Sequence, residues 1–89
     1  MEESKKKEIC FKNGCQKIES GDLINAIPFF LAAEEYHPVL FCLFSIGEVE
    51  DCKILKKLLE KQGRLKKLNE EKFSLIPNCL KLEDLAHLL

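Results

Sequence analysis

Apolar residues recur at helical spacing along almost the whole chain, and no other feature limits the possible folds as much. Phe11, Cys15 and Ile18 follow one another at intervals of four and three residues. Leu55 and Leu59 lie four residues apart in a later segment. This spacing gathers apolar side chains on one face of an α-helix, whereas a half-buried strand would alternate apolar and polar residues. No such alternation of useful length occurs, so the sequence predicts an all-α fold.

Glycine residues divide this pattern into separate helical segments. Gly21, Gly47 and Gly63 each follow an apolar pattern, where glycine can adopt a backbone angle that other residues avoid. Asp22 then provides a side chain suited to capping the next helix. Pro38 marks a further expected helix end, because the residue before a proline avoids helical conformation. The expected helices span residues 4–20, 23–36, 48–62 and 79–89, with a short apolar segment at 39–46.

Three segments depart from the simple helical pattern. Pro28 lies inside the expected helix 23–36, where proline costs about 3 kcal/mol or kinks the helix. That helix is therefore expected to be kinked or to begin late. Residues 39–46 are apolar on nearly every side, which predicts that they form the most buried element. Residues 64–78 are strongly charged and include a turn at 76–78.

Length and composition limit the kind of protein further. The 89 residues are enough for one small domain, and a formal net charge of −1 makes the chain neither a polycation nor an acidic tail. No apolar run approaches the ~20 residues that span a membrane, and residues 1–8 do not resemble a secretory signal. The five cysteines form no C-x-x-C pair and are expected as reduced thiols in the cytoplasm or nucleus. They are Cys10, Cys15, Cys42, Cys52 and Cys79.

Two passages of the sequence repeat each other. Residues 21–26 (GDLINA) and 47–52 (GEVEDC) share a glycine, an acidic residue, an aliphatic residue and then a small residue at the same offsets. Chains that repeat a helix-turn-helix unit usually stack the units into a solenoid. The repetition therefore favours a helical-hairpin repeat.

The first of these units resembles the tetratricopeptide repeat over about 34 residues. The resemblance implies two antiparallel helices that approach closely at Gly14 and Ala26. It also implies that Phe30 fills the wedge between them and that Pro38 ends the second helix. The positions that carry the resemblance are Gly14, Gly21-Asp22, Ala26, Phe30, Ala33 and Pro38.

The resemblance has departures that leave other folds open. Cys10 and Lys17 stand where the family carries aromatic residues, and Pro28 is foreign to its second helix. The two glycine-acid turns are 26 residues apart, whereas the family repeats every ~34 residues. The shorter spacing also suits an ankyrin-like hairpin. Residues 47–63 are similar to the second helix of that repeat, although its Thr-Pro-Leu-His signature is absent. An unrelated small bundle is the third alternative.

Together these patterns predict a single helical domain over residues 1–89. Its architecture is expected to be a small helical-hairpin repeat, or a right-angled bundle of four to five helices, with a C-terminal capping helix. The expected parts are a tetratricopeptide-like hairpin at 5–38, a second, shortened hairpin at 39–63, a charged linker at 64–78 and a capping helix at 79–89.

No residue pattern predicts a catalytic, cofactor-binding or metal site. Cys10 and Cys15 are too far apart on a helix to share a metal, and His37 and His87 are expected as surface imidazoles. Cys42 is close to His37 in the sequence but lies in the most apolar segment, where a thiolate is disfavoured. The families resembled here bind peptides or protein surfaces and are not enzymes. The resemblance therefore implies a non-enzymatic protein-interaction module, an adaptor or a small subunit of a larger assembly.

Two surfaces are candidates for binding a partner. Between residues 53 and 67 seven basic residues accompany one acidic residue, and such a stripe either contacts phosphates or simply solubilises a helix face. The phosphate interpretation makes an RNA- or ribosome-associated accessory protein the alternative function. The second candidate is apolar surface left exposed for a protein partner or a second copy, unless the helix 79–89 folds back to complete the core. The basic residues are Lys53, Lys56, Lys57, Lys61, Arg64, Lys66 and Lys67, and the apolar candidates are Phe29, Phe41 and Phe44.

Overall fold

Six helices account for most of the computed structural model, which describes residues 2–89. Met1, the first residue of the expected domain, lies outside the described residues. No strand occurs within residues 2–89, and the predicted all-α fold is confirmed. The helices are α1 (Glu2–Glu19), α2 (Leu23–Ala32), α3 (Tyr36–Ser45), α4 (Val49–Gln62), α5 (Glu70–Ser74) and α6 (Leu82–Leu88).

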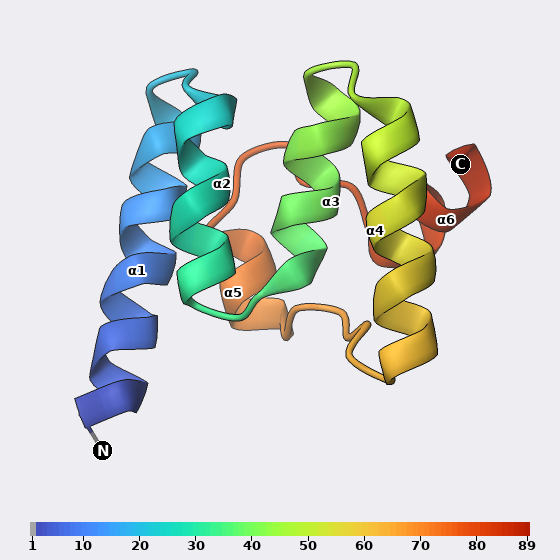
Figure 1. Ribbon diagram of the computed structural model, residues 1–89. Helices are drawn as coiled ribbons and strands as arrows, with labels where there is room; N and C mark the ends of the chain where they lie inside the picture. Colours follow the sequence, from blue (N-terminus) through green and yellow to red (C-terminus); the bar gives the residue numbers. More distant parts are fainter. Residues whose placement is uncertain (1) are drawn as a thin grey trace.

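The first four helices stand side by side in chain order and alternate in direction (Figure 1). α1 packs on α2, α2 on α3, and α3 on α4, while α6 returns to contact α3. The chain after α4 passes behind this row, with α5 behind α2 and α3. α3 is therefore enclosed by its neighbours, and six consecutive residues, His37 to Cys42, are buried. The prediction that this apolar segment is the most buried element is confirmed.

The hairpin of α1 and α2 closes around a glycine and two aromatic rings. The rings of Phe11 and Phe30 meet edge to face with centroids 5.5 Å apart. A Cβ added to Gly14 would lie only 2.8 Å from two carbon atoms of the Phe30 ring. Phe30 and Ala26 are both fully buried. The close approach at Gly14, with Phe30 between the helices, is thus confirmed as a packing arrangement, and Ala26 is buried in the same hairpin.

The two repeated glycine-acid passages adopt the same helix-ending backbone. Gly21 and Gly47 have φ angles of +82° and +91°, in the region that glycine adopts without steric cost. The amide of Asp22 donates to the Lys17 carbonyl at 2.8 Å, and the amide of Glu48 donates to the Leu43 carbonyl at 2.9 Å. Each of these hydrogen bonds joins an amide to the carbonyl five positions before it. It thereby pairs a carbonyl that the end of a helix would otherwise leave without a donor.

The boundary between α2 and α3 corrects the expected helix 23–36. α2 ends at Ala32, and Glu34 turns the chain with a φ of +57° while the Glu35 amide donates to the Phe30 carbonyl at 3.0 Å. Pro38 lies in the first turn of α3, where amides have no partner within the helix and the missing N–H of proline costs nothing. The expectation that Pro38 ends a helix is therefore wrong, because this proline helps to start one.

Glu34→Gly is expected to stabilise the protein, because the left-handed backbone costs a non-glycine residue about 1 kcal/mol. Urea denaturation followed by circular dichroism should show a higher unfolding midpoint. Glu34→Ala is the matched control, since it removes the same side chain and keeps the backbone strain. If glycine and alanine lowered the midpoint equally, the side chain would matter more than the backbone.

Pro28 lies inside α2 without delaying the start of the helix. α2 begins at Leu23, and the carboxylate of Asp22 caps it by accepting from the Asn25 amide at 3.2 Å. Proline has no N–H to donate to the carbonyl of Ile24. Because Ile24 is 64% exposed, water can reach this part of the helix, and the late start allowed for above does not occur.

The segment 64–78 is more than the charged linker expected from the sequence. It contains α5, whose N-terminus is capped by the Asn69 side chain accepting from the Lys72 amide at 2.8 Å. Leu68 and Ile76 on either side of α5 are buried in the core. After it, α6 folds back so that Leu85 is fully buried, which completes the core on the side of α3.

Candidate functional site

His37 joins α3 to the C-terminal part of the chain and was not expected to be buried. The Leu68 amide donates to Nδ1 at 3.1 Å, and Nε2 lies 2.8 Å from the Leu80 carbonyl. Because an amide can only donate, Nδ1 accepts and the proton of the neutral ring is on Nε2, which donates to Leu80. Burial lowers the pKa of His37, and the Leu80 carbonyl and the Glu35 carboxylate oppose this only in part. The expectation of a surface imidazole is wrong for His37, while His87 is exposed.

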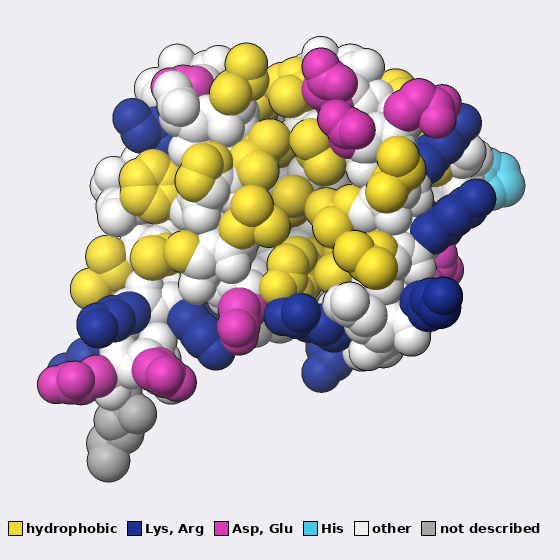
Figure 2. Space-filling model, viewed as in Figure 1, with side chains coloured by type: hydrophobic (Ala, Val, Ile, Leu, Met, Phe, Trp, Pro, Cys, Tyr) yellow, Lys and Arg dark blue, Asp and Glu magenta, His cyan; other side chains and the backbone are white. Residues whose placement is uncertain are grey.

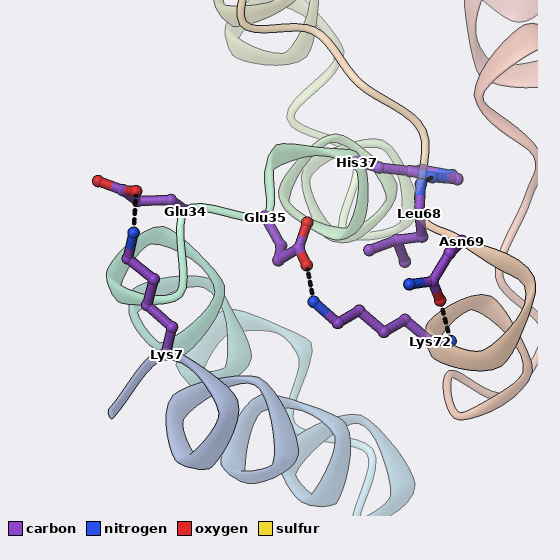
Figure 3. Close-up of polar contacts among 7 residues, drawn as sticks. All are labelled: Lys7, Glu34, Glu35, His37, Leu68, Asn69 and Lys72. Atoms are coloured by element: carbon purple, nitrogen blue, oxygen red, sulfur yellow. Dashed lines mark hydrogen bonds and ion pairs between the residues drawn. The ribbon is translucent and has the colours of Figure 1, made fainter. Parts of the chain in front are cut away.

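A shallow pocket of about 330 Å³ lies beside His37. The ring of Phe73 stacks on the imidazole with centroids 5.9 Å apart, and charged side chains from α5 and α6 surround the opening. Both ring nitrogens of His37 are already used by backbone groups. Figure 3 shows the ring beside Leu68. The histidine therefore holds the chain together here, and it has no free nitrogen for acid-base chemistry or metal binding.

A second pocket of about 450 Å³ lies between α1, α5 and the turn after α2, and the side chains of two ion pairs line it. Lys7 pairs with Glu34 at 2.6 Å, and Lys72 pairs with Glu35 at 2.5 Å (Figure 3). Pairing raises the pKa of Lys7 and lowers that of Glu34. Lys72 also lies over the ring of Phe11, 5.4 Å from its centroid, which fixes α5 against α1. All four charges have a partner, so this pocket is most simply a point of attachment between segments.

The cysteines are thiols held in apolar surroundings. All five are free, and Cys15, Cys42 and Cys52 are buried. Burial raises the pKa of Cys15 to about 11 and those of Cys42 and Cys79 to about 12. A thiol with such a pKa is not a nucleophile at neutral pH. Within residues 2–89, no three His, Cys, Asp or Glu side chains are grouped so that they could hold a metal ion.

The basic stripe expected from the sequence is divided by the structure. Lys53 pairs with Glu50 at 3.8 Å, and Lys56 pairs with Glu60 at 3.1 Å with its side chain only 20% exposed. Arg64 lies over the ring of Tyr36 and donates to the Tyr36 hydroxyl at 2.6 Å. The remaining four lysines are exposed and have no ion pair within residues 2–89. They are Lys57 and Lys61 on α4 and Lys66 and Lys67 after it.

The predicted apolar candidates do not form the exposed apolar surface. Phe41 is 7% exposed and belongs to the core, so its prediction as a contact residue is wrong. Phe29 and Phe44 are half-buried, and Phe44 packs against the core. They were expected to be exposed because the chain has many large apolar residues for a small core, but residues His37 to Cys42 of α3 are all buried. The burial of Phe41 agrees instead with the prediction that the apolar segment 39–46 is the most buried element.

Seven large aliphatic side chains of residues 2–89 are exposed, four of them on α2 and α4 and the others at Ile9, Leu75 and Leu88. Figure 2 shows hydrophobic side chains gathered across α2, α3 and α4 on one face of the row, with Lys and Arg along the outer edge of α4. On α2, Ile24 is 64% and Leu31 is 43% exposed, and on α4 Ile54 is 63% and Leu58 is 49% exposed. We call these four residues the apolar face. Helical periodicity identified their helices, but an exposed position on an apolar pattern looks the same in sequence as a buried one.

Two further observations concern the chain as a whole. No helix within residues 2–89 has the length and hydrophobicity needed to cross a lipid bilayer. Comparison of the chain with protein-family models, with curated proteins and with solved structures finds no match.

Proposed function

We propose that the protein is a non-enzymatic interaction module, an adaptor or a small subunit of a larger assembly, whose protein partner covers the apolar face. The observation that carries this proposal is the pair of exposed aliphatic side chains on each of α2 and α4, together with the hydrophobic side chains that Figure 2 shows gathered across α2, α3 and α4. Single exposed apolar residues are common on proteins, but contiguous apolar patches mark interaction sites. The resemblance to helical-repeat families that bind proteins supports the same function, although a fold alone is weak evidence for it.

The apolar face can supply useful binding energy. Fully burying a Leu or Ile side chain contributes about 1.5–3 kcal/mol. Covering the exposed half of four such side chains would therefore contribute on the order of 3–6 kcal/mol before the costs of association. The face is also held on helices with a packed core, so little ordering is required on binding. Five free cysteines favour a cytoplasmic or nuclear location, where a reduced protein would meet its partner.

The alternative function is an RNA- or ribosome-associated accessory protein. Its support is the group of exposed lysines without ion pairs at 57, 61, 66 and 67. Lysines that are free of acidic partners can release counterions when they bind phosphates. The case is weaker than the sequence suggested, because Lys53, Lys56 and Arg64 are engaged within the chain.

A photo-crosslinking amino acid placed at Ile24 or Ile54 is expected to capture the same protein from native lysate. The same amino acid at His87, which is exposed on α6, is the matched control and should capture nothing. Leu58→Lys should abolish the crosslink from Ile54 while circular dichroism shows an unchanged helical spectrum, since a charge on the apolar face opposes burial. Crosslinks from His87 alone, or crosslinks that disappear after nuclease treatment, would contradict the proposal and favour the RNA alternative.

A further inference from the structure

The two edges of the apolar face differ in charge. α2 contains no charged residue, so the edge with Ile24 and Leu31 is uncharged along the whole helix. On α4, Lys57 and Lys61 follow Ile54 by three and seven residues, and helical geometry places residues at these intervals side by side. Both lysines are exposed and lack an ion pair within residues 2–89. The apolar face therefore has a cationic edge along the C-terminal half of α4, while the acidic residues Glu50 and Asp51 occupy the first turn of that helix.

The surface of the apolar face offers little to an extended peptide. Its exposed side chains are hydrocarbons, and the backbone groups of α2 and α4 are used within the helices except where Pro28 leaves the Ile24 carbonyl without a donor. An extended segment lying here would bury its own N–H and C=O groups without partners, which is unfavourable. An α-helix satisfies these groups internally, and its side chains recur at the same spacing as those of α2 and α4.

A second copy of the chain is the other occupant to consider. In a symmetric dimer the same surface is used on both copies. Contact through α2 would leave Lys57 and Lys61 facing an uncharged helix, whereas two antiparallel copies of α4 would bring them to Glu50 and Asp51 of the other copy. The oligomeric state of the chain is therefore measured beside the peptide affinities.

Building on the proposed function, we propose that the apolar face binds one amphipathic helix that carries acidic side chains along one side. The apolar side of this helix packs against the four residues of the apolar face. Its acidic side faces Lys57 and Lys61, which fixes the rotation of the bound helix about its axis. This arrangement follows the general mode in which a helix lies on an apolar surface and charged rim residues select its orientation.

Two fluorescently labelled model peptides test this proposal with the full chain. Both form an amphipathic helix of about 18 residues with leucines along one side, and they differ only in carrying Glu or Lys on the flank. By fluorescence anisotropy at low salt, the Glu peptide is expected to bind about tenfold more tightly than the Lys peptide. The double variant Lys57→Glu, Lys61→Glu should reverse this preference, and Leu58→Gln should weaken both peptides. Lys5→Glu with Lys6→Glu, two exposed lysines of α1, is the matched control and should change neither affinity.

The outcomes separate this proposal from the function on which it rests. Equal binding of the two peptides would overturn the acidic character of the partner. If neither peptide bound while Ile54 still crosslinked to a protein, the helical occupant would be wrong and the proposed function would stand. Loss of both peptide binding and crosslinks would overturn this proposal and the proposed function together. Sedimentation of the chain as a dimer that Leu58→Gln dissociates would identify a second copy as the occupant and overturn the proposal.

Discussion

Replacing Phe30 with alanine is expected to lower the free energy of unfolding by about 3–5 kcal/mol, the usual cost of emptying a buried aromatic site. The Phe30 side chain is fully buried between α1 and α2, where it meets the Phe11 ring edge to face. A small domain has a total stability on the order of 5–10 kcal/mol, so this single change removes much of it. Urea denaturation followed by circular dichroism at 222 nm, a helix band, measures the loss.

The same site gives a sharper test through Gly14. Gly14→Ala should cost about 1–3 kcal/mol, because the new methyl group would lie 2.8 Å from the Phe30 ring and overpacking strains a core. In the Phe30→Ala background the same change should be neutral or stabilising, since the ring is gone and alanine favours a helix over glycine by about 1 kcal/mol. Gln16→Ala, on the exposed surface of α1, is the control and should stay within about 0.5 kcal/mol of the parent. An equal cost of Gly14→Ala in both backgrounds would contradict the close packing of these two residues.

Replacing His37 with phenylalanine is expected to lower the free energy of unfolding by about 2–4 kcal/mol, because it leaves two buried backbone groups without partners. The Leu68 amide loses its acceptor and the Leu80 carbonyl loses its donor. Phenylalanine keeps a flat ring that can still stack on Phe73, so the change tests the hydrogen bonds more than the packing. Faster hydrogen exchange of the Leu68 amide would locate the effect at this contact.

Stability should also depend on pH through His37. Its pKa is lowered in the folded protein from an ordinary value of 6.5, because burial disfavours the charged ring. Below pH 6.5 the unfolded chain therefore binds a proton that the folded chain does not. The stabilisation is complete above that pH and falls by up to about 1.4 kcal/mol per pH unit as the pH decreases toward the folded pKa.

Variants of the two histidines distinguish the effect of His37 on stability from the titration of other groups. Urea denaturation at pH 7.5, 6.5 and 5.5 should show the decrease in the parent and in His87→Gln, because His87 is exposed. His37→Phe should be less stable at every pH and should lose the dependence between pH 6.5 and 5.5. A dependence that survives in His37→Phe would mean that another group titrates in this range.

Local chemistry decided most of the helices, and these were predictable. The ends of α1, α3 and α4 each have a glycine with positive φ, and a glycine at the end of an apolar pattern is visible in sequence. The boundary after α2 was missed because Glu34, a residue with no preference for the left-handed region, makes the turn. Pro38 was ambiguous, since proline is compatible both with the residues after a helix and with the first turn of the next one.

The candidate site was less predictable, because exposure depends on which elements meet. Phe41 and Ile54 both lie in apolar helical patterns, yet the first is 7% exposed and the second 63% exposed. Sequence places both on helices, and only the enclosure of α3 by its neighbours separates them.

The sequence by itself determined an all-helical chain and the position of its glycine turns, because these depend on periodicity and on local backbone preferences, while the close approach of the first two helices at Gly14 was implied only by the resemblance to a helical repeat. Only the tertiary structure decided the burial of His37, whose hydrogen bonds reach residues 31 and 43 positions away. It also decided which apolar side chains remain exposed on α2 and α4. Contacts between segments so far apart depend on how the helices pack, and no local pattern encodes that arrangement.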